Sequence, residues 1–157
     1  MVGDLAPIFA LRDLQDNDVF IRDYCGELRQ PWKNNEPQVV LLSFFTTYCQ
    51  PCLKEFPILI KLSQKFIHQN LKILLVDLKE DKKRVQKFAT EQGIKLPVLL
   101  DRYGVVAKKY GVTSVPRIFV INEQGKLIWM TKGFSPSLEH DLMQLLNSKF
   151  ANAIEKE

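Results

Sequence analysis

The sequence predicts an α/β domain with a central mixed β-sheet flanked by helices and an N-terminal β-hairpin extension. Two apolar runs, residues 39–45 and 71–77, have the length and the β-branched and aromatic content of buried strands. Between them, over residues 56–67, apolar side chains recur at helical spacing. A strand, a helix and a strand in this order predict a parallel pair joined by a right-handed crossover.

Length and composition predict one domain over residues 1–157. A chain of 157 residues can bury a sizeable core, and a hydrophobic content of 46% excludes a disordered protein. The net charge of +4 is mild, and its local cluster at residues 82–84 is interpreted as a solvated helix face. We therefore expect no nucleic-acid partner. No apolar run in the sequence approaches membrane-spanning length.

The N-terminal region is expected to form the hairpin. Residues 8–11 alternate as in a short strand, residues 16–18 signal a turn, and residues 19–21 suit the returning strand. Residues 27–38 are polar and hold two prolines, which predicts an inserted surface loop. Trp32 is expected to pack this loop down rather than to serve a partner.

Helices and strands alternate after the second buried strand. Asp81 is expected to cap one helix, and Asp101, at the end of a strand over residues 97–101, to cap the next. Pro116 opens a strand, which a hairpin turn joins to a return strand at residues 127–130.

The last helix is expected to begin at Ser135 and Pro136, a good N-cap and first helical residue. The tail, residues 151–157, is expected to fray.

A Cys-x-x-Cys pair carries the chemistry. Cys49, Gln50, Pro51 and Cys52 follow the first buried strand and open the helix after it, and Pro51 suits a first helical turn. A thiol at a helix N-terminus faces unpaired N–H groups and the positive end of the helix dipole, so we expect a depressed pKa for Cys49. Cys49 would attack a disulfide, and the more shielded Cys52 would resolve the mixed disulfide.

Other uses of the pair are less favoured. Half of a zinc site would need further ligands, and the remaining candidates, Cys25, His68 and His140, are scattered. A structural disulfide across two residues would stabilise the fold only weakly. Cys25 itself is interpreted as a small, partly buried residue, with a regulatory bridge to Cys49 or to another molecule as the minority alternative.

Residues 47–57 read Thr-Tyr-Cys-Gln-Pro-Cys-Leu-Lys-Glu-Phe-Pro. This segment resembles the active site of thioredoxin-like proteins of the TlpA/ResA type, and the opening at residues 2–11 is similar to that of TlpA-like proteins and peroxiredoxins. The resemblance covers nearly the whole chain and implies a thioredoxin-like fold. Tyr48 stands where the family usually has Trp, and Gln50 where the ResA branch has Glu. Because residues between the cysteines tune the redox potential in this superfamily, the resemblance does not predict the potential.

A second landmark of the resemblance lies at residues 113–122. The matching proline of thioredoxin-like folds is cis and packs against the cysteine pair, which implies a cis Val115–Pro116 bond. The resemblance also implies that the Val115 backbone pairs with substrate as an added strand. Arg117 replaces the usual Thr. Its charge would either favour the thiolate and attract acidic substrates, or point away into solvent.

Glu80 follows the second buried strand at the spacing of a glutamate that ResA-type proteins carry close to the cysteine pair. It is either a carboxylate that tunes thiol acidity or relays protons, or an exposed loop residue beside a helix start. Ser43 occupies the position where thioredoxin keeps a buried proton-accepting Asp. That role is therefore absent here or supplied by another group such as Glu80.

These features predict a thiol–disulfide oxidoreductase acting on protein disulfides, with Cys49 as nucleophile and Cys52 as the resolving thiol. Pro116 would shape the substrate surface and Glu80 would assist. No cofactor or metal is expected, because the electrons reside in the cysteine pair. The resemblance implies a monomeric reductant of the cytochrome c maturation type, with protein disulfide or dithiol substrates and an upstream thiol reductant. The residues expected to contact substrate are Tyr48, Gln50, Pro51, Val115 and Arg117.

Family members of this type are mostly periplasmic or otherwise extracytoplasmic, and the resemblance implies the same here, with membrane contact only through a trimmed N-terminal anchor. Residues 1–4 carry no signal peptide, so a chain complete as given would be cytoplasmic.

Three alternative functions stay open. A peroxiredoxin-like peroxidase is suggested by the shared opening. A copper-chaperone-like metal-binding assembly factor has a similar fold but usually spaces its cysteines CxxxC and adds a histidine, neither of which is seen. A binding module could keep the motif without turnover.

Overall fold

The computed structural model describes residues 1–27 and 36–155, with the side chains of residues 152–155 left aside. The inserted loop expected at residues 27–38, with Trp32, lies largely outside the described residues. The strands are β1 (Ala10–Asp13), β2 (Asp18–Phe20), β3 (Val39–Phe45), β4 (Leu71–Leu78), β5 (Val98–Asp101), β6 (Arg117–Ile121) and β7 (Leu127–Lys132). The helices are the 3-10 turn η1 (Ile21–Asp23) and α1 (Gln50–Lys65), α2 (Lys82–Glu91), α3 (Val105–Lys109) and α4 (Leu138–Glu155).

All seven described strands join one mixed sheet in the order β2-β1-β5-β4-β3-β6-β7. Strands β3, β4 and β5 run parallel, whereas β6 and β7 on one side and β1 and β2 on the other pair antiparallel. The predicted N-terminal hairpin is therefore present, and it extends the sheet through β5.

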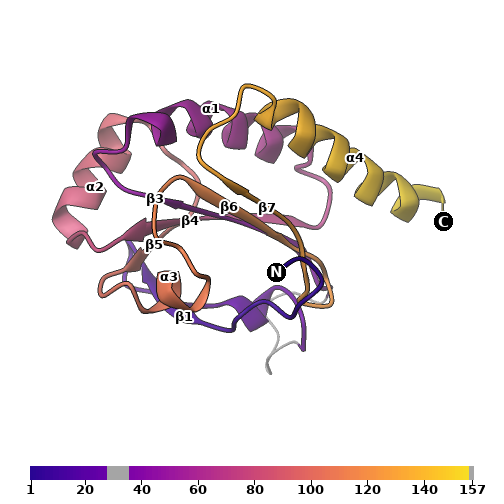
Figure 1. Ribbon diagram of the computed structural model, residues 1–157, viewed down its shortest axis with the longest axis horizontal. Helices are drawn as coiled ribbons and strands as arrows, with labels where there is room; N and C mark the ends of the chain where they lie inside the picture. The colour runs from indigo at the N-terminus through magenta and orange to yellow at the C-terminus, as the bar shows by residue number, and fades with distance from the viewer. Residues whose placement is uncertain (28–35, 156–157) are drawn as a thin grey trace.

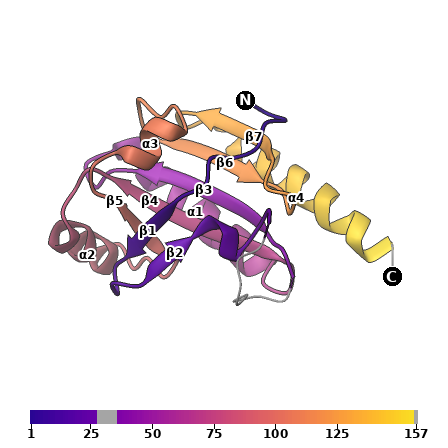
Figure 2. The same ribbon diagram turned by 90° about the horizontal axis from the view of Figure 1, so that it is seen from below.

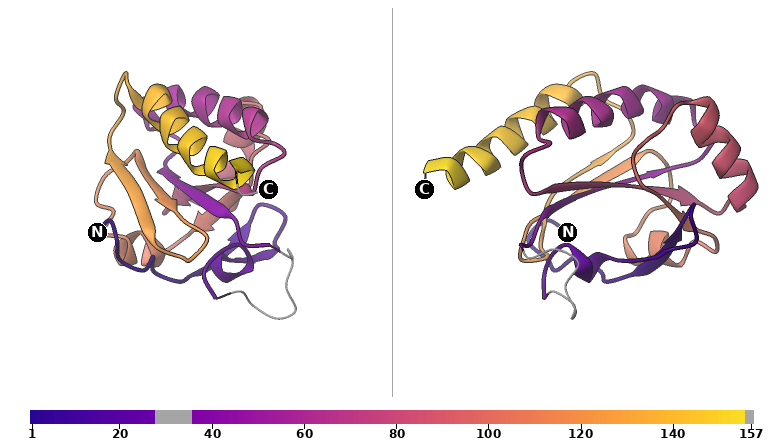
Figure 3. Two further views of the ribbon diagram at one scale, coloured as in Figure 1. Left: turned by 90° about the vertical axis from the view of Figure 1, so that its right-hand side faces the viewer. Right: turned by 180° about the vertical axis from the view of Figure 1, so that it is seen from behind.

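Helices cover both faces of the sheet. Figure 1 shows α1 and α4 above it and α3 with β1 below it, and Figure 2, seen from below, shows the hairpin and α3 in front of the parallel strands. Helices α1 and α4 lie side by side in both views of Figure 3, and an ion pair of 2.6 Å joins Lys61 to Glu139 between them. The predicted α/β architecture is confirmed.

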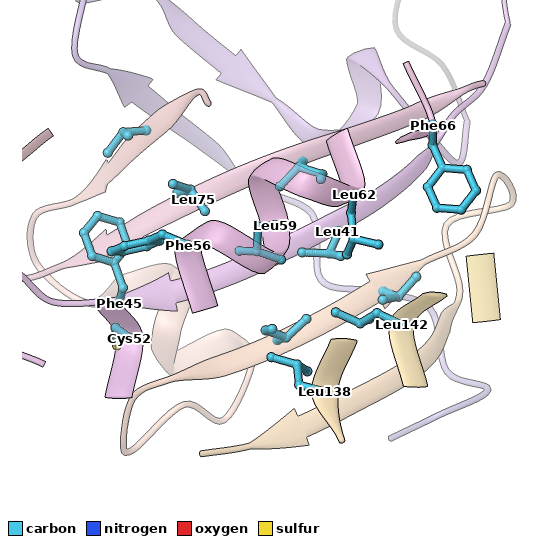
Figure 4. Packing of buried hydrophobic residues seen from close by; sticks show 14 of the residues in the cluster. Leu41, Phe45, Cys52, Phe56, Leu59, Leu62, Phe66, Leu75, Leu138 and Leu142 are labelled. Carbon is cyan, nitrogen blue, oxygen red and sulfur yellow. The ribbon is translucent and has the colours of Figure 1, made fainter. Parts of the chain in front are cut away.

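The sheet separates two cores, because alternate strand residues point to opposite faces. The α1-side core lies under α1, α2 and α4 and includes Leu41, Phe56, Leu59 and Leu142 (Figure 4). The α3-side core holds the other face of the same strands, including Leu42 of β3. Every residue of β3 is buried, which matches its unbroken apolar sequence.

Several element boundaries differ from the expected ones. Helix α4 begins at Leu138, because Ser135, Pro136 and Ser137 form a separate turn in which the Leu138 N–H donates to the Ser135 carbonyl. The helix extends as far as Glu155, so residues 151–155 of the tail expected to fray are helical, and the fraying itself stays a prediction. Extending a formed helix fixes one residue per added hydrogen bond, which makes such continuation inexpensive.

Asp81 and Asp101 act as expected at helix starts. Asp81 accepts from the N–H of Arg84 at 2.9 Å, and Asp101 accepts from the N–H groups of Val106 and Ala107. Among the residues that the structure describes, no helix is long and apolar enough to cross a bilayer.

Candidate active site

The cysteine pair lies at the carboxyl end of β3, where α1 begins. Cys49 is the N-cap of α1, and its Sγ accepts from the N–H of Cys52 at 3.2 Å. The two cysteines form a disulfide with a Cα–Cα distance of 5.3 Å. Pro51 occupies the first turn, where its missing N–H costs nothing. The predicted placement of a sulfur against the unpaired N–H groups of a helix start is thus confirmed.

The two sulfurs differ in access. Cys49 is 8% exposed and Cys52 is 1% exposed. Three neighbours of the pair, Tyr48, Gln50 and Pro51, are exposed, and Tyr48 presents 70% of its surface. An attacking molecule therefore meets Cys49 first, within a rim formed by these three side chains.

Three phenylalanines fix the helix against the sheet beside the pair. The ring centroids of Phe45 and Phe56 are 5.3 Å apart, and Phe88 of α2 lies 5.9 Å from Phe45 and 6.0 Å from Phe56. Edge-to-face and stacked contacts of this kind stabilise beyond the burial of area alone. The end of β3, the start of α1 and the middle of α2 are held together by this cluster.

The Val115–Pro116 bond is cis, as the resemblance implied. Pro116 is buried, and half-buried Val115 packs against the α1-side core that contains both cysteines. Within the described chain, no hydrogen bond joins the main chain of Val115 to another residue. This strand-like segment keeps its polar groups open beside the pair.

Arg117 lies neither beside the cysteine pair nor in solvent, the two positions considered for it from the sequence. It is buried, its Nε donates to the Thr131 carbonyl at 2.9 Å, and its guanidinium lies 4.8 Å from the ring centroid of Phe119. Phe119 belongs to the α3-side core. The structure therefore does not bring the Arg117 charge together with the cysteine pair, which lies on the other face of the sheet.

Glu80 reaches the turn that leads into Cys49. Its Oε1 accepts from the N–H of Thr47 at 2.7 Å, and its Oε2 accepts from the Thr47 hydroxyl at 2.5 Å. Arg84 Nε lies 3.0 Å from Glu80 Oε2. Burial opposes ionisation of Glu80, but the neighbouring Asp77 carboxyl, the hydrogen bonds from Thr47 and the Arg84 charge lower its pKa overall. Glu80 is 8% exposed and is thus no solvent-exposed loop residue.

Two buried carboxyls near the site were not identified from the sequence. Glu55 is 1% exposed, and neither of its side-chain oxygens has a hydrogen-bond partner among the described residues. Burial raises the pKa of Glu55 to about 8. Its spacing was an available signal, because Glu55 lies three residues after Cys52 and beside Phe56 on the face of α1 that turns inward.

The second is Asp77, which is 0% exposed near the end of β4. Burial and then the neighbouring Glu80 raise the pKa of Asp77 to about 9. In the sequence, Asp77 ends an apolar run and was interpreted only as the last residue of a strand. No neighbouring residue indicated that its carboxyl would be buried. Ser43 is buried in β3 without an ionisable group, so carboxyls near this pair come from α1, β4 and the turn after β4.

The fold and the site define a thioredoxin-like protein with a redox-active disulfide at a helix N-terminus. Residues 2–130 match the model of the AhpC/TSA family. The chain therefore belongs to that family.

The curated relatives make the class narrower. The thiol-disulfide oxidoreductase ResA of Bacillus thuringiensis subsp. konkukian is 32% identical over 132 residues, which cover 84% of this chain and 70% of the relative. ResA of Bacillus subtilis is 32% identical over 145 residues, covering 92% of this chain and 75% of the relative. This chain is accordingly a redox enzyme of the thiol–disulfide oxidoreductase class.

Solved structures agree with the fold. A putative thiol:disulfide interchange protein DsbE from Chlorobium tepidum is 27% identical and superimposes with a TM-score of 0.82, over 94% of this chain and 96% of that chain. The solution structure of a putative protein disulfide isomerase from Bacteroides thetaiotaomicron has the same TM-score at 24% identity.

Proposed function

We propose that this chain reduces disulfides of protein substrates in an extracytoplasmic compartment, as a reductant of the cytochrome c maturation type. The observation that carries the proposal is the graded access of the pair at the start of α1, where Cys49 is 8% exposed and Cys52 is 1% exposed. The names of the ResA relatives support thiol–disulfide exchange, and the resemblance of the motif to TlpA/ResA-type proteins supports the reductive direction.

The exchange proceeds in two steps. The Cys49 thiolate attacks one sulfur of the substrate disulfide, that bond breaks, and the released substrate thiolate takes a proton from solvent. Cys52 then loses its proton and attacks Cys49 Sγ, which releases the second substrate thiolate and forms the Cys49–Cys52 disulfide. The substrate gains two electrons, and an upstream dithiol must return two electrons to the pair before the next cycle.

Glu55 is suited to accept the proton of Cys52. It lies one helical turn after Cys52 in α1 and is buried with it. A pKa of about 8 lets this carboxyl both hold and release a proton near neutrality. The environment that makes the charged form of Glu55 costly is also what makes it an effective base once ionised.

Substrate would bind across the exposed rim and the cis-proline segment. Tyr48, Gln50 and Pro51 surround Cys49, and the open main chain of Val115 can pair with an extended substrate segment. Pro116 keeps this segment in place beside the pair.

The reduction potential of the Cys49–Cys52 couple tests the proposal. It would be measured by equilibration with glutathione or dithiothreitol in a Cys25→Ser background, with insulin reduction as the turnover assay. A potential near about −250 mV or below, close to thioredoxin at about −270 mV, is expected for a reductant. A value near about −120 mV, typical of a strong periplasmic oxidant, would identify a disulfide donor instead.

Peroxide reduction is the second candidate function. Thr46 lies three residues before Cys49, is buried, and its hydroxyl has no hydrogen-bond partner among the described residues. A peroxidatic cysteine would need only Cys49. Peroxide consumption that survives Cys52→Ser would support this function. Loss of peroxide consumption in that variant would argue against a peroxidase and favour the disulfide reductase.

The remaining alternatives have their own tests. Stoichiometric copper binding that requires both Cys49 and Cys52 would indicate a metal-binding assembly factor. Failure to reduce insulin under excess reductant would indicate a binding module without turnover.

A further inference from the structure

The turn that carries the nucleophile is tied to the neighbouring strand by a carboxyl group. Strands β3 and β4 are parallel neighbours, and Phe45 pairs with Asp77 at their carboxyl ends. The residues that follow each strand, Thr47 and Glu80, therefore meet although 33 positions separate them. Both oxygens of Glu80 are used on Thr47, which is two residues before Cys49.

Asp77 lies beneath this contact. It points to the same face of the sheet as Phe45, because paired residues of parallel strands share a face. Neither carboxyl oxygen of Asp77 has a hydrogen-bond partner of standard geometry among the described residues. Glu80 follows three residues later and is held at this end of β3 and β4 by its two bonds to Thr47, and the proximity of its carboxyl is one of the causes that raise the pKa of Asp77.

The backbone between Asp77 and Glu80 has an unusual conformation. Lys79 adopts a φ of 63°, in the left-handed region that residues other than glycine seldom occupy. The chain turns sharply there, immediately before Glu80. Unusual conformations of this kind persist where the surrounding contacts require them.

The other charged groups around Asp77 interact with it less directly than Glu80 does. Arg84 of α2 is the cation whose charge acts on Asp77, and its side chain contacts Glu80 and Thr47. Glu55 of α1 is buried over the same face of the sheet, and burial favours its neutral form. Asp101 of β5 is engaged on the opposite face with the N–H groups of α3.

Two adjacent buried carboxylates cannot both be ionised without a large penalty. If one carboxyl keeps its proton, its O–H donates to the other and the penalty is removed. The Arg84 charge and the two Thr47 bonds favour the anion at Glu80. Burial and the Glu80 anion raise the pKa of Asp77, which places the proton there.

We propose that Asp77 and Glu80 share one proton and act together as a positioning unit, which holds the turn before Cys49 through Thr47. This inference rests on the proposed function in one respect: the turn held by Thr47 presents Cys49, the nucleophile of disulfide reduction. Loss of the shared proton in alkaline solution creates two facing anions, so Glu80 withdraws from Thr47 and the turn loosens. Asp77 and Glu80 touch neither substrate nor sulfur in this role.

The test follows the turn and the thiol separately between about pH 7 and about pH 11, a range centred on the pKa of about 9 for Asp77. NMR would record the Asp77 carboxyl carbon and the Thr47 amide of the reduced, unsubstituted protein. Both signals are expected to titrate with one shared alkaline midpoint. Stopped flow would record the reaction of Cys49 with a small disulfide, and its rate is expected to rise to a plateau and then fall.

Variants separate the shared proton from a structural role. Asp77→Asn keeps a donor for Glu80 at every pH, so the alkaline fall in rate and the Thr47 titration are both expected to be lost. Glu80→Ala removes the acceptor and is expected to lose the hydrogen-exchange protection of the Thr47 amide. Glu91→Gln removes an exposed carboxylate from α2 and serves as the matched control, with a profile like that of the unsubstituted chain.

The proposal would be overturned if the pH–rate profiles of the unsubstituted chain and Asp77→Asn superimposed. It would also be overturned if NMR showed the Asp77 carboxyl titrating near the ordinary pKa of an aspartate. The NMR titration needs no variant, so a variant that fails to fold leaves the proposal open to refutation. Neither readout uses a protein substrate or the reduction potential. A failure of the disulfide-reductase function would appear in those assays and leave these profiles unchanged.

Discussion

Cys25 is the third cysteine and lies in the α3-side core, away from the redox pair. It is 3% exposed, and its Sγ lies 3.9 Å from the Ile21 carbonyl oxygen. Burial, with a smaller contribution from the Glu123 charge, raises the pKa of Cys25 to about 12. The residue therefore packs as a small apolar side chain, as expected from the sequence.

We predict that Cys25 resists alkylation in the folded, reduced protein, because it is both covered and protonated. Mass spectrometry after a short iodoacetamide pulse at neutral pH should find Cys49 modified and Cys25 intact. Unfolding in urea should expose it to the reagent. Rapid labelling of Cys25 without unfolding would contradict its buried position.

Glu55 makes the stability of the chain depend on pH. The folded chain keeps the Glu55 proton up to a pKa of about 8, whereas the unfolded chain releases it near the ordinary value of 4.5. Between these values the unfolded state binds fewer protons, so the free energy of unfolding falls as pH rises, by up to about 1.4 kcal/mol per pH unit.

Glu55→Gln should remove the Glu55 part of this dependence, since glutamine stays neutral in both states, and leave the part that comes from the raised pKa of Asp77. Urea unfolding of the oxidised protein should show similar stability for both proteins near pH 5 and a more stable variant near pH 8. Glu91→Gln, at an exposed glutamate of α2, is the control and should keep the original slope. Parallel stability curves for Glu55→Gln and the unsubstituted chain would show that Glu55 ionises normally.

At the scale of elements, the turn between β6 and β7 is fastened to the N-terminal segment. The Gly125 carbonyl accepts from the N–H of Ala6 at 2.8 Å, and the Glu123 carbonyl accepts from the N–H of Gly26 at 2.9 Å. Gly125 has a φ of 81°, and a Cβ there would lie 3.1 Å from the Cα of Gly26. The close approach of two backbones thus requires glycine at this position.

Gly125→Ala is predicted to destabilise the protein more than Gly93→Ala. Both positions have positive φ, which costs an alanine about 1–2 kcal/mol, but a Cβ on Gly93 would meet no atom within 4 Å. Chemical denaturation of both variants would give the difference. Equal losses would mean that the N-terminal segment moves aside at little cost.

On the scale of the whole molecule, one sheet is shared by two cores. Leu59 of α1 is buried in the α1-side core, and Leu99 of β5 is buried in the α3-side core. Strand β3 contributes to both, because its successive side chains alternate between faces. Neither core can be lost without exposing the strands that form the other.

Leu59→Ala and Leu99→Ala should each lower the free energy of unfolding by about 2–5 kcal/mol and keep a single transition. Far-UV and near-UV circular dichroism recorded on the same urea series would test this, and the two curves should superimpose for each variant. Separate midpoints in either variant would show that the cores unfold independently.

The sequence by itself determined the elements and the redox pair. Strand 39–45, the cysteines after it and Pro51 at the helix start are specified by apolar runs, caps and proline chemistry that act over a few residues. The cis bond at Pro116 followed from the resemblance of the motif, and the structure confirms it. Such signals are local, and they can therefore be read without knowing the fold.

The electrostatics of the site depend on contacts that form only in the folded protein. Apart from the spacing of Glu55 after Cys52, no local pattern separates Glu55 and Asp77 from ordinary acids, and the placement of Glu80 and Arg117 stayed open at the level of sequence. Whether a carboxyl is charged depends on which elements cover it and which donors reach it. Those neighbours, such as Thr47 for Glu80, come from distant parts of the chain and meet only when the parallel strands pair.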